Sequence, residues 1–252
     1  MNQHHLTIVT GASRGMGLAM AEQLIAAGHD LLCISRKHND ALELRAASAG
    51  RRCEQWPQDL ARPQTAAARL ETWLAGHDGT TLASVTLINN AGMLPRIAPL
   101  GEISAADLAD ALRVDLEAPM LLTSAFLRAT RAWAAVRKVL NISSGLGRRA
   151  MASQAPYCAA KAGMDHFTRC VALEEAVKPN GATVCSLAPG VIDTDMQVQL
   201  RGADASRFPD IGNFIGMKDK GALSSPSEAA AKVLEFLARP DFGSHPVADV
   251  RD

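Results

Sequence analysis

The stretch VTGASRGMG, residues 9–17, decides the fold. It follows the apolar run LTIVT (6–10), precedes a helical pattern, and contains Gly11, Gly15 and Gly17. A turn leaving a buried strand needs residues that tolerate positive φ, and a backbone that approaches a pyrophosphate closely needs residues without side chains. Free N–H groups at the start of the next helix favour phosphate. The stretch predicts a dinucleotide-binding turn, although a tight strand–helix turn without a ligand has the same pattern.

Short apolar runs alternate with longer helical patterns along the rest of the chain. The runs lack strict in/out alternation, which is typical of a parallel sheet covered by helices on both faces. We predict a single domain, 1–252, with a Rossmann-like, doubly wound α/β fold. The segment 196–225 is long and irregular in pattern, so we predict a substrate lid there. Strands are expected at 6–10, 30–35, 52–59, 84–92, 137–144 and 181–190, and long helices at 104–132 and 154–177.

The composition excludes several classes of protein. Lys plus Arg and Asp plus Glu number 26 each, so the net charge is zero, which argues against binding to nucleic acid or to an anionic membrane surface. The start of the chain does not have the features of a signal peptide, and apolar runs stay well short of the roughly 20 residues that span a bilayer. Five scattered cysteines indicate reduced thiols in a cytoplasmic protein, and the seven histidines show no metal-ligand spacing.

Two arginines point to the form of the dinucleotide. An acidic residue about 20 positions past the glycines holds the ribose 2′-OH of NAD, whereas an arginine there accepts the 2′-phosphate of NADP. That spacing falls on Arg36, and Arg14 lies inside the turn itself. The pair predicts NADP(H), although either side chain could be a solvated surface charge. Asp59 ends the third expected strand and is placed either beside the adenine or at a helix N-cap.

The only tyrosine of the chain, Tyr157, stands four residues before Lys161 in a helical pattern. Residues at this spacing share a helix face, and a nearby ammonium lowers the pKa of a phenol. Such a phenol can protonate a carbonyl oxygen as hydride arrives. Ser144 ends the preceding strand, where its hydroxyl could bind the same oxygen. Each residue taken alone has an ordinary structural explanation, and it is their combination that predicts catalysis.

Five stretches together resemble short-chain dehydrogenases/reductases: TGASRGMG (10–17), NNAG (89–92), SS (143–144), YCAAK (157–161) and APGVIDTDM (188–196). The resemblance covers nearly the whole chain. It implies hydride transfer between NAD(P)H and a carbonyl or alcohol, and a homodimer or homotetramer. It also implies that Tyr157 is the acid/base, that Lys161 lowers its pKa and that Ser144 orients the substrate. The residues predicted to bind the cofactor are Gly11, Ser13, Arg14, Gly15, Met16, Gly17, Arg36, Asp59, Leu60, Asn90, Ala91, Gly92, Tyr157, Lys161, Val191 and Thr194.

One position departs from the family pattern. Where the family carries an asparagine, this chain has Asp115 in RVDLEAP. The resemblance implies that this residue kinks its helix and helps to hold a water that leads to the lysine. An ionised carboxylate accepts hydrogen bonds but cannot donate them, and it brings a negative charge near Lys161. We expect Asp115 to act in a working but retuned proton relay.

Several stretches resemble sepiapterin reductases and bacterial benzil reductases, including the lid end KGALSSPSEAAAKVLEFL. The predicted activity is NADPH-dependent reduction of a small carbonyl compound, aromatic or 1,2-dicarbonyl. Secondary-alcohol oxidation and a non-catalytic NADP(H) sensor or scaffold remain as alternatives. Asp249 could hold the substrate as the resemblance implies, or be an exposed tail charge. The lid residues Phe208, Phe214 and Met217 could cover the substrate or anchor the loop.

Overall fold

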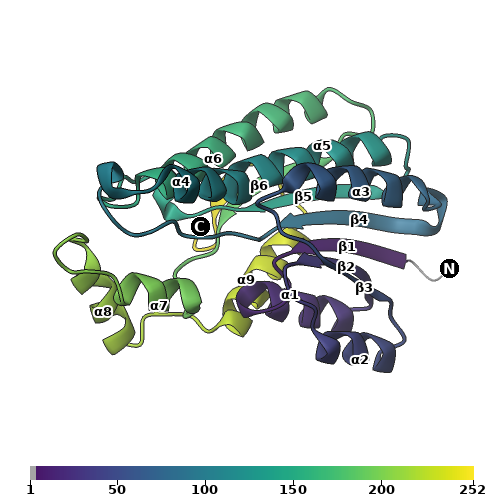
Figure 1. Cartoon of the computed structure of the whole chain (residues 1–252). Helices are drawn as coiled ribbons and strands as arrows, with labels where there is room; N and C mark the ends of the chain where they lie inside the picture. The colour runs from purple at the N-terminus through teal and green to yellow at the C-terminus, as the bar shows by residue number, and fades with distance from the viewer. Residues whose placement is uncertain (1–3) are drawn as a thin grey trace.

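The computed structural model describes residues 4–252, so the first three residues of the predicted domain lie outside them. Within this range seven strands form one parallel sheet in the order β3-β2-β1-β4-β5-β6-β7 (Figure 1). The chain runs outward from β1 in one direction, then crosses to β4 and runs outward in the other, so the sheet is doubly wound. The strands are β1 (His4–Thr10), β2 (His29–Ser35), β3 (Cys53–Pro57), β4 (Leu82–Asn89), β5 (Val136–Ile142), β6 (Thr183–Ala188) and β7 (Val247–Asp249).

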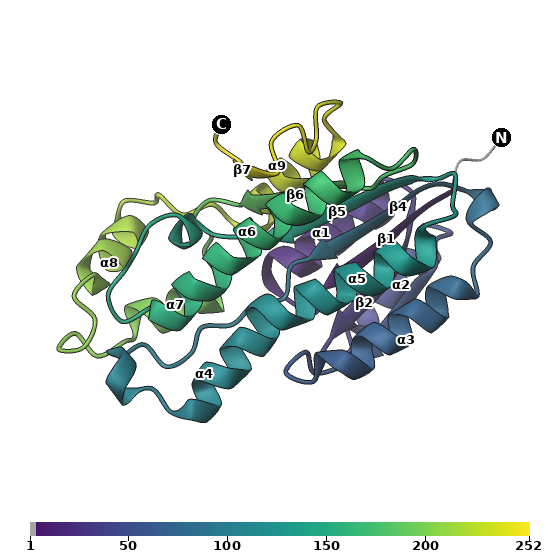
Figure 2. The ribbon, with the colours of Figure 1, turned by 90° about the horizontal axis from the view of Figure 1, so that it is seen from above.

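Helices cover both faces of the sheet, as Figures 1 and 2 show. One layer consists of α1 (Gly15–Ala26), α2 (Asp40–Ser48) and α9 (Pro226–Ala238). The other consists of α3 (Pro63–Ala75), α4 (Ala105–Leu112), α5 (Ala118–Thr130) and α6 (Ala155–Ala176). Consecutive residues of β1 explain why two layers are needed. Ile8 packs into one hydrophobic cluster and Val9 into the other, and both are completely buried. The predicted Rossmann-like fold is therefore confirmed.

Two segments differ from the expectation. The helix expected at 104–132 is interrupted by a π-helical turn, Arg113–Glu117, between α4 and α5. The segment 196–225, expected to be irregular, carries α7 (Asp195–Arg201) and α8 (Ile211–Asp219). Both helices are too short to show a clear period in the sequence. They are held by apolar contacts among Leu200, Phe208 and Phe214 rather than by a long amphipathic face.

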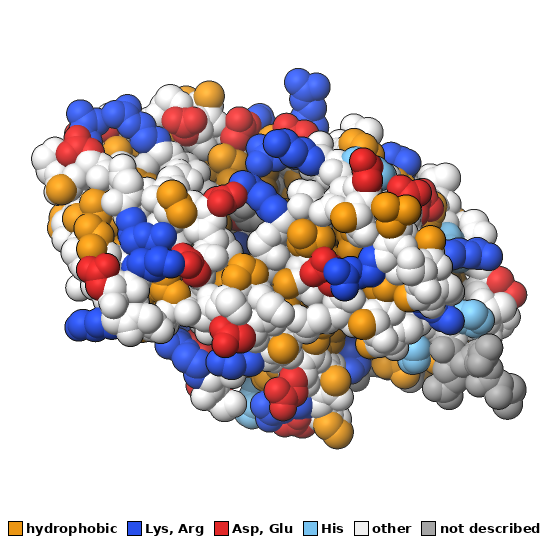
Figure 3. Space-filling view, turned by 90° about the horizontal axis from the view of Figure 1, so that it is seen from below, with side chains coloured by type: hydrophobic (Ala, Val, Ile, Leu, Met, Phe, Trp, Pro, Cys, Tyr) orange, Lys and Arg blue, Asp and Glu red, His pale blue; other side chains and the backbone are white. Residues whose placement is uncertain are grey.

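The surface, the helices and the polar side chains add three observations. On the face seen in Figure 3, Lys and Arg side chains lie interspersed with Asp and Glu, as the balanced composition suggests. Among residues 4–252, no helix is both long enough and apolar enough to cross a membrane. In the same residues we find no cluster of three His, Cys, Asp or Glu side chains that could hold a metal ion.

Candidate active site

The glycine turn joins β1 to α1 at the carboxyl edge of the sheet. Gly11 and Gly15 adopt φ values of 70° and 58°, which side chains disfavour. A Cβ atom on Gly17 would lie 2.2 Å from the carbonyl oxygen of Gly11, so this position has no room for one. The Asn90 side-chain amide donates to the Thr10 carbonyl (2.9 Å), which ties the turn to the end of β4. The turn leaves its backbone accessible, as close approach of a pyrophosphate requires.

The start of α1 fits the same group. Arg14 is the N-cap residue, and its side chain makes no capping hydrogen bond. The first N–H groups of the helix therefore remain available, and they lie at the positive end of the helix dipole. The guanidinium of Arg14 instead forms an exposed ion pair with Asp195, at the start of α7. The residues of the turn thus fit a dinucleotide phosphate, and Arg14 also contacts the start of α7, directly before the predicted lid.

Arg36 and Asp59, predicted to lie beside the adenosine part of the cofactor, follow β2 and β3. Arg36 follows β2 and is exposed, with its side chain on the wall of the cavity described below. Asp59 accepts a hydrogen bond from the Ala61 amide (3.0 Å), and the N-cap of α3 is Arg62. The alternative that Asp59 caps this helix is therefore wrong. Leu60 is almost fully buried and contributes an apolar wall.

A cavity of about 1380 Å³ runs along the carboxyl edge of the sheet. Drug-sized ligands occupy roughly 300–1000 Å³, so this cavity has room for a dinucleotide and a second molecule. All sixteen residues predicted to bind the cofactor line it, from the glycine turn to Val191 and Thr194. Ser144 also lines the cavity, so the structure brings the cofactor residues and the Ser–Tyr–Lys set to one site.

Ser144, Tyr157 and Lys161 come together from two elements. Ser144 follows β5, and its hydroxyl oxygen accepts from the Leu146 amide (3.1 Å). Tyr157 and Lys161 lie one turn apart on α6, with the Lys161 Nζ atom 5.5 Å from the centre of the Tyr157 ring. Lys161 donates to the Ile142 carbonyl (3.1 Å), which fixes the ammonium against the end of β5. Both α6 side chains are over nine-tenths buried.

The electrostatics of Tyr157 partly differ from the expectation. Burial raises the pKa of its phenol above the usual value. The charge of Lys161 and a hydrogen bond with Ser144 lower it, but they offset only part of the effect of burial. Lys161 therefore acts in the expected direction without reversing the net shift. An oxidised nicotinamide beside the phenol would add a second positive charge and lower the pKa further.

Asp115 lies in the π-helical turn, behind Lys161. Its Oδ1 atom is 3.5 Å from the Lys161 Nζ atom and accepts from the Met93 amide (3.1 Å). Its Oδ2 atom is buried without a hydrogen-bond partner among residues 4–252. Burial raises the pKa of this carboxyl to about 6, although the charge of Lys161 opposes the shift. π-helical turns occur frequently at functional sites, and this one brings the carboxylate to the lysine.

The predicted substrate residues separate into two groups. Phe214 and Met217 line the cavity. Phe208 is completely buried and stacks on Phe214, with the ring centres 5.5 Å apart, so it anchors the lid and lies away from the cavity. Leu94 and Met151 line the cavity as well. The sequence analysis missed both, because they come from segments distant in sequence and match no motif.

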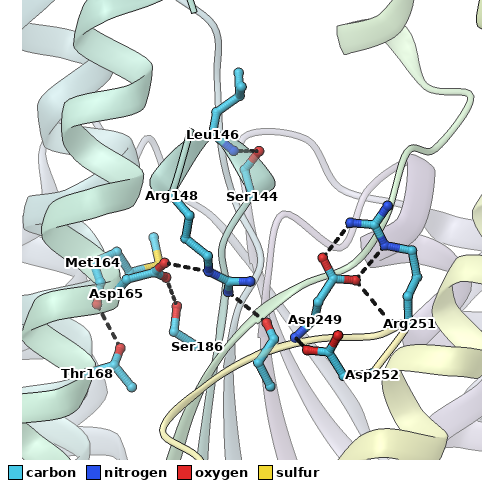
Figure 4. A network of polar contacts seen from close by, with 11 residues as sticks. Ser144, Leu146, Arg148, Met164, Asp165, Thr168, Ser186, Asp249, Arg251 and Asp252 are labelled. Atoms are coloured by element: carbon cyan, nitrogen blue, oxygen red, sulfur yellow. Dashed lines mark hydrogen bonds and ion pairs between the residues drawn. The ribbon is translucent and has the colours of Figure 1, made fainter. Parts of the chain in front are cut away.

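Asp249 and its neighbours form the polar network shown in Figure 4. Asp249 lies at the end of β7, lines the cavity and is mostly buried, so the alternative of an exposed tail charge is wrong. Its carboxylate is bound by Arg251. Arg251 also lines the cavity, and the sequence analysis did not consider it.

A family model described as short chain dehydrogenase matches residues 5–205. This chain is a short-chain dehydrogenase. It is 33% identical to a benzil reductase ((S)-benzoin forming) of Bacillus cereus over 235 residues, which cover 93% of this chain and 94% of that protein. The family assignment makes the chain an oxidoreductase that uses a nicotinamide cofactor. The predicted resemblance to benzil reductases is confirmed, and that to sepiapterin reductases stays a prediction.

Solved structures agree with the fold of this short-chain dehydrogenase. A 3-oxoacyl-[acyl-carrier protein] reductase from Brucella melitensis in complex with NAD has a TM-score of 0.81 and 23% identity, with 99% of this chain and 96% of that chain covered. A metagenomic short-chain oxidoreductase in complex with NADP has a TM-score of 0.73 and 27% identity, with 96% and 95% covered. Because structures with either dinucleotide resemble the chain, the choice between NAD and NADP depends on its own residues.

Proposed function

We propose that this short-chain dehydrogenase is an NADPH-dependent reductase of small carbonyl compounds, aromatic or 1,2-dicarbonyl. The observation that carries the proposal is that the Tyr157–Lys161 pair and the apolar side chains of the lid meet on one wall of the cavity. Tyr157 belongs both to the pair with Lys161 and to the apolar cluster of the lid. A carbonyl oxygen next to the phenol would thus have apolar side chains around the rest of its molecule. The similarity to the benzil reductase of Bacillus cereus supports an aromatic dicarbonyl.

The roles of the three residues follow from their chemistry. When bound, the reduced nicotinamide supplies the hydride. Tyr157 is the general acid that protonates the substrate oxygen, and Ser144 donates a hydrogen bond to the same oxygen as its negative charge develops. Lys161 stabilises the phenolate that remains, because its ammonium lies next to the ring. Asp115 holds the other side of Lys161 and can itself take up a proton.

The preference for NADPH rests on Arg36. Its guanidinium is exposed on the cavity wall after β2, where a 2′-phosphate would be placed in this fold. The fork of N–H groups on an arginine matches a phosphate through charge-assisted hydrogen bonds. Arg14 contributes less, since its guanidinium is already paired with Asp195.

The test is an absorbance assay of the purified chain with NADPH or NADH and a carbonyl panel that includes benzil and sepiapterin. We expect benzil turnover with NADPH, and weaker turnover with NADH. Comparable rates with the two dinucleotides would contradict the cofactor assignment. Absence of turnover with every carbonyl compound would contradict the proposal and favour a sensor or scaffold. Faster oxidation of benzoin with NADP⁺ than reduction of benzil would favour the secondary-alcohol dehydrogenase.

Two further parts of the proposal concern the oligomeric state of the protein and its location in the cell. We keep the homodimer or homotetramer as a proposal that the resemblance implies. The small residues of α6 support it less, because Ala160 is completely buried and Gly163 packs against Leu116 of the same chain. Light scattering that finds only monomer would contradict it. The cytoplasmic location is likewise proposed, because all five cysteines are free thiols.

A further inference from the structure

Arg251 lines the same cavity as Ser144 and Tyr157 and leaves its guanidinium largely exposed. The side chain is 70% exposed, whereas that of Asp249, its partner, is 10% exposed. Both residues line the same cavity as Ser144 and Tyr157. Arg251 therefore extends from the buried carboxylate toward the open cavity, and Figure 4 shows the two side chains facing each other.

The carboxylate of Asp249 already accepts three hydrogen bonds, all from Arg251. Its Oδ1 atom accepts from Arg251 Nε (2.7 Å) and from the Arg251 amide (3.1 Å), and its Oδ2 atom accepts from Arg251 Nη2 (2.6 Å). A carboxylate bound by such a two-pronged pair is a poor partner for a basic group on a substrate. The geometry therefore does not favour direct binding of the substrate by Asp249.

The guanidinium, by contrast, keeps donors free. An arginine has five N–H groups and no acceptor, and the pair with Asp249 uses two of the five. The remaining N–H groups lie on the other edges of the planar group, on the exposed side chain. A ligand at this point must therefore supply a hydrogen-bond acceptor. Because Asp249 balances the charge of Arg251, a neutral carbonyl oxygen suffices.

The backbone that carries this pair is fixed to the Ser144 loop. Arg148 donates from Nη2 to the Ala248 carbonyl (2.7 Å) and from Nε to Asp165 (3.3 Å). Asp165, buried on α6, also accepts from the Ser186 hydroxyl of β6 (2.6 Å). One guanidinium thus joins β7, α6 and the loop after Ser144, as Figure 4 shows. The β7 backbone three residues before Arg251 is thereby fixed to the loop that follows Ser144.

We propose that Arg251 determines specificity by donating to the second carbonyl oxygen of a 1,2-dicarbonyl substrate while Ser144 and Tyr157 bind the first. The inference rests on the proposed carbonyl reduction and deepens it, because it names the feature of the substrate that is recognised. The substrate class is a carbonyl compound that carries a second acceptor on the adjacent carbon. A ketone with a single carbonyl lacks the group that Arg251 binds.

The test compares benzil with deoxybenzoin, which has the same skeleton with one carbonyl replaced by a methylene. For each substrate, kcat/KM of the Arg251→Met variant is divided by that of the wild type, so that the different reactivity of the two ketones cancels. We expect the loss to be at least about tenfold larger for benzil than for deoxybenzoin, as for a hydrogen bond from a charged donor. Arg251→Lys, which keeps a charged donor, should recover part of the difference.

Arg239→Met is a matched control. Arg239 binds Asp241, also two residues away, through the same two-pronged pair (3.0 and 2.9 Å), but it is not among the residues that line the cavity. This variant should leave both substrates unaffected. The dissociation constant of NADPH is measured in parallel, and Arg251→Met should leave it within about twofold of the wild type.

Equal losses for the two ketones, no loss for either, or a matching loss of NADPH affinity would each overturn the assignment of Arg251. Calorimetric binding of both ketones to the NADP⁺-saturated protein gives the same comparison without turnover. If the wild type reduces neither ketone, the proposed function fails. The dissociation constants of the two ketones, measured for the wild type and for Arg251→Met, still decide whether Arg251 binds the second oxygen.

Discussion

The two ends of the cavity are built in different ways. At the proposed cofactor end the backbone makes the surface: Gly11 and Gly15 adopt positive φ, Gly17 has no room for a side chain, and all three line the cavity. At the catalytic end side chains make the surface, and Tyr157 and Lys161 are buried and held by packing. A binding surface made of backbone has no room for an added side-chain atom. A surface made of side chains can lose a single polar group, such as a hydroxyl, and keep its shape.

The largest effect that sharpens this comparison is expected for Tyr157→Phe. The ring keeps its apolar contacts with the lid, and only the hydroxyl is removed, which lies 4.0 Å from the Met196 sulfur and hydrogen-bonds with Ser144. Loss of a general acid lowers turnover by about 10²–10⁴-fold. We expect kcat to fall by that factor in the NADPH assay.

Binding of NADPH to Tyr157→Phe, followed by fluorescence titration, should match the wild type. Undiminished turnover would remove Tyr157 from the mechanism. A loss of cofactor binding instead would mean that the two ends of the cavity are not independent.

The cofactor end is tested by Gly17→Ala. The new methyl group would lie 2.2 Å from the Gly11 carbonyl oxygen and 2.5 Å from the Asn90 side chain, so the turn must shift. Such overpacking costs about 1–3 kcal/mol. We expect a lower melting temperature and at least about tenfold weaker NADPH binding in the same titration.

Gly101→Ala is the matched control for this substitution. A methyl group there meets nothing within 4 Å, so neither stability nor cofactor binding should change. If Gly17→Ala bound NADPH like the wild type, the turn would not be the phosphate site.

A smaller effect is expected for Arg36→Met, because this side chain is exposed and only adds to a surface that the backbone makes. Removing one charge-assisted contact to a 2′-phosphate should weaken NADPH binding by about tenfold and leave NADH binding unchanged. The ratio of the two dissociation constants measures this. An equal effect on both dinucleotides would show that Arg36 does not recognise the 2′-phosphate.

The smallest effect, within a few-fold in rate at the optimum, is expected for Asp115→Asn. The negative charge of Asp115 raises the pKa of Tyr157, so removing it should let the phenol lose its proton at lower pH. Reduction needs the protonated phenol, and the alkaline limb of the pH–rate profile should therefore move to lower pH. An inflection near pH 6, from the raised pKa of Asp115, should disappear.

An inactive but folded Asp115→Asn would show that the chain requires a carboxylate at this position. A profile identical to that of the wild type would show that Asp115 has no electrostatic influence on the relay.

Features set by local pattern were predictable from the sequence. The glycine turn, the alternation of strands and helices and the Tyr157–Lys161 spacing each depend on a few neighbouring residues, and the fold is confirmed. The start of α9 (Pro226–Ala238) is also set by local pattern, because Ser225 and Glu228 form a capping box there.

Features set by distant contacts were not predictable. The π-helical turn depends on contacts between Asp115, Lys161 and Met93, which come from three separate segments. The lid helices depend on an apolar cluster without a sequence period. Arg251 gains its importance only because β7 pairs with β6 and brings the end of the chain to the cavity.

The π-helical turn has a consequence for how this chain tolerates insertions and deletions. A π turn holds one residue more than an α turn, so deleting a single residue from 113–117 would let α4 and α5 join in one regular helix. Because a π turn accommodates its extra residue locally, α4 and α5 would keep their faces, and only the residues within the turn would change position. Asp115 could no longer face Lys161 while α5 kept its packing. The straighter helix would be easier to form, and the carboxylate would be lost from the site.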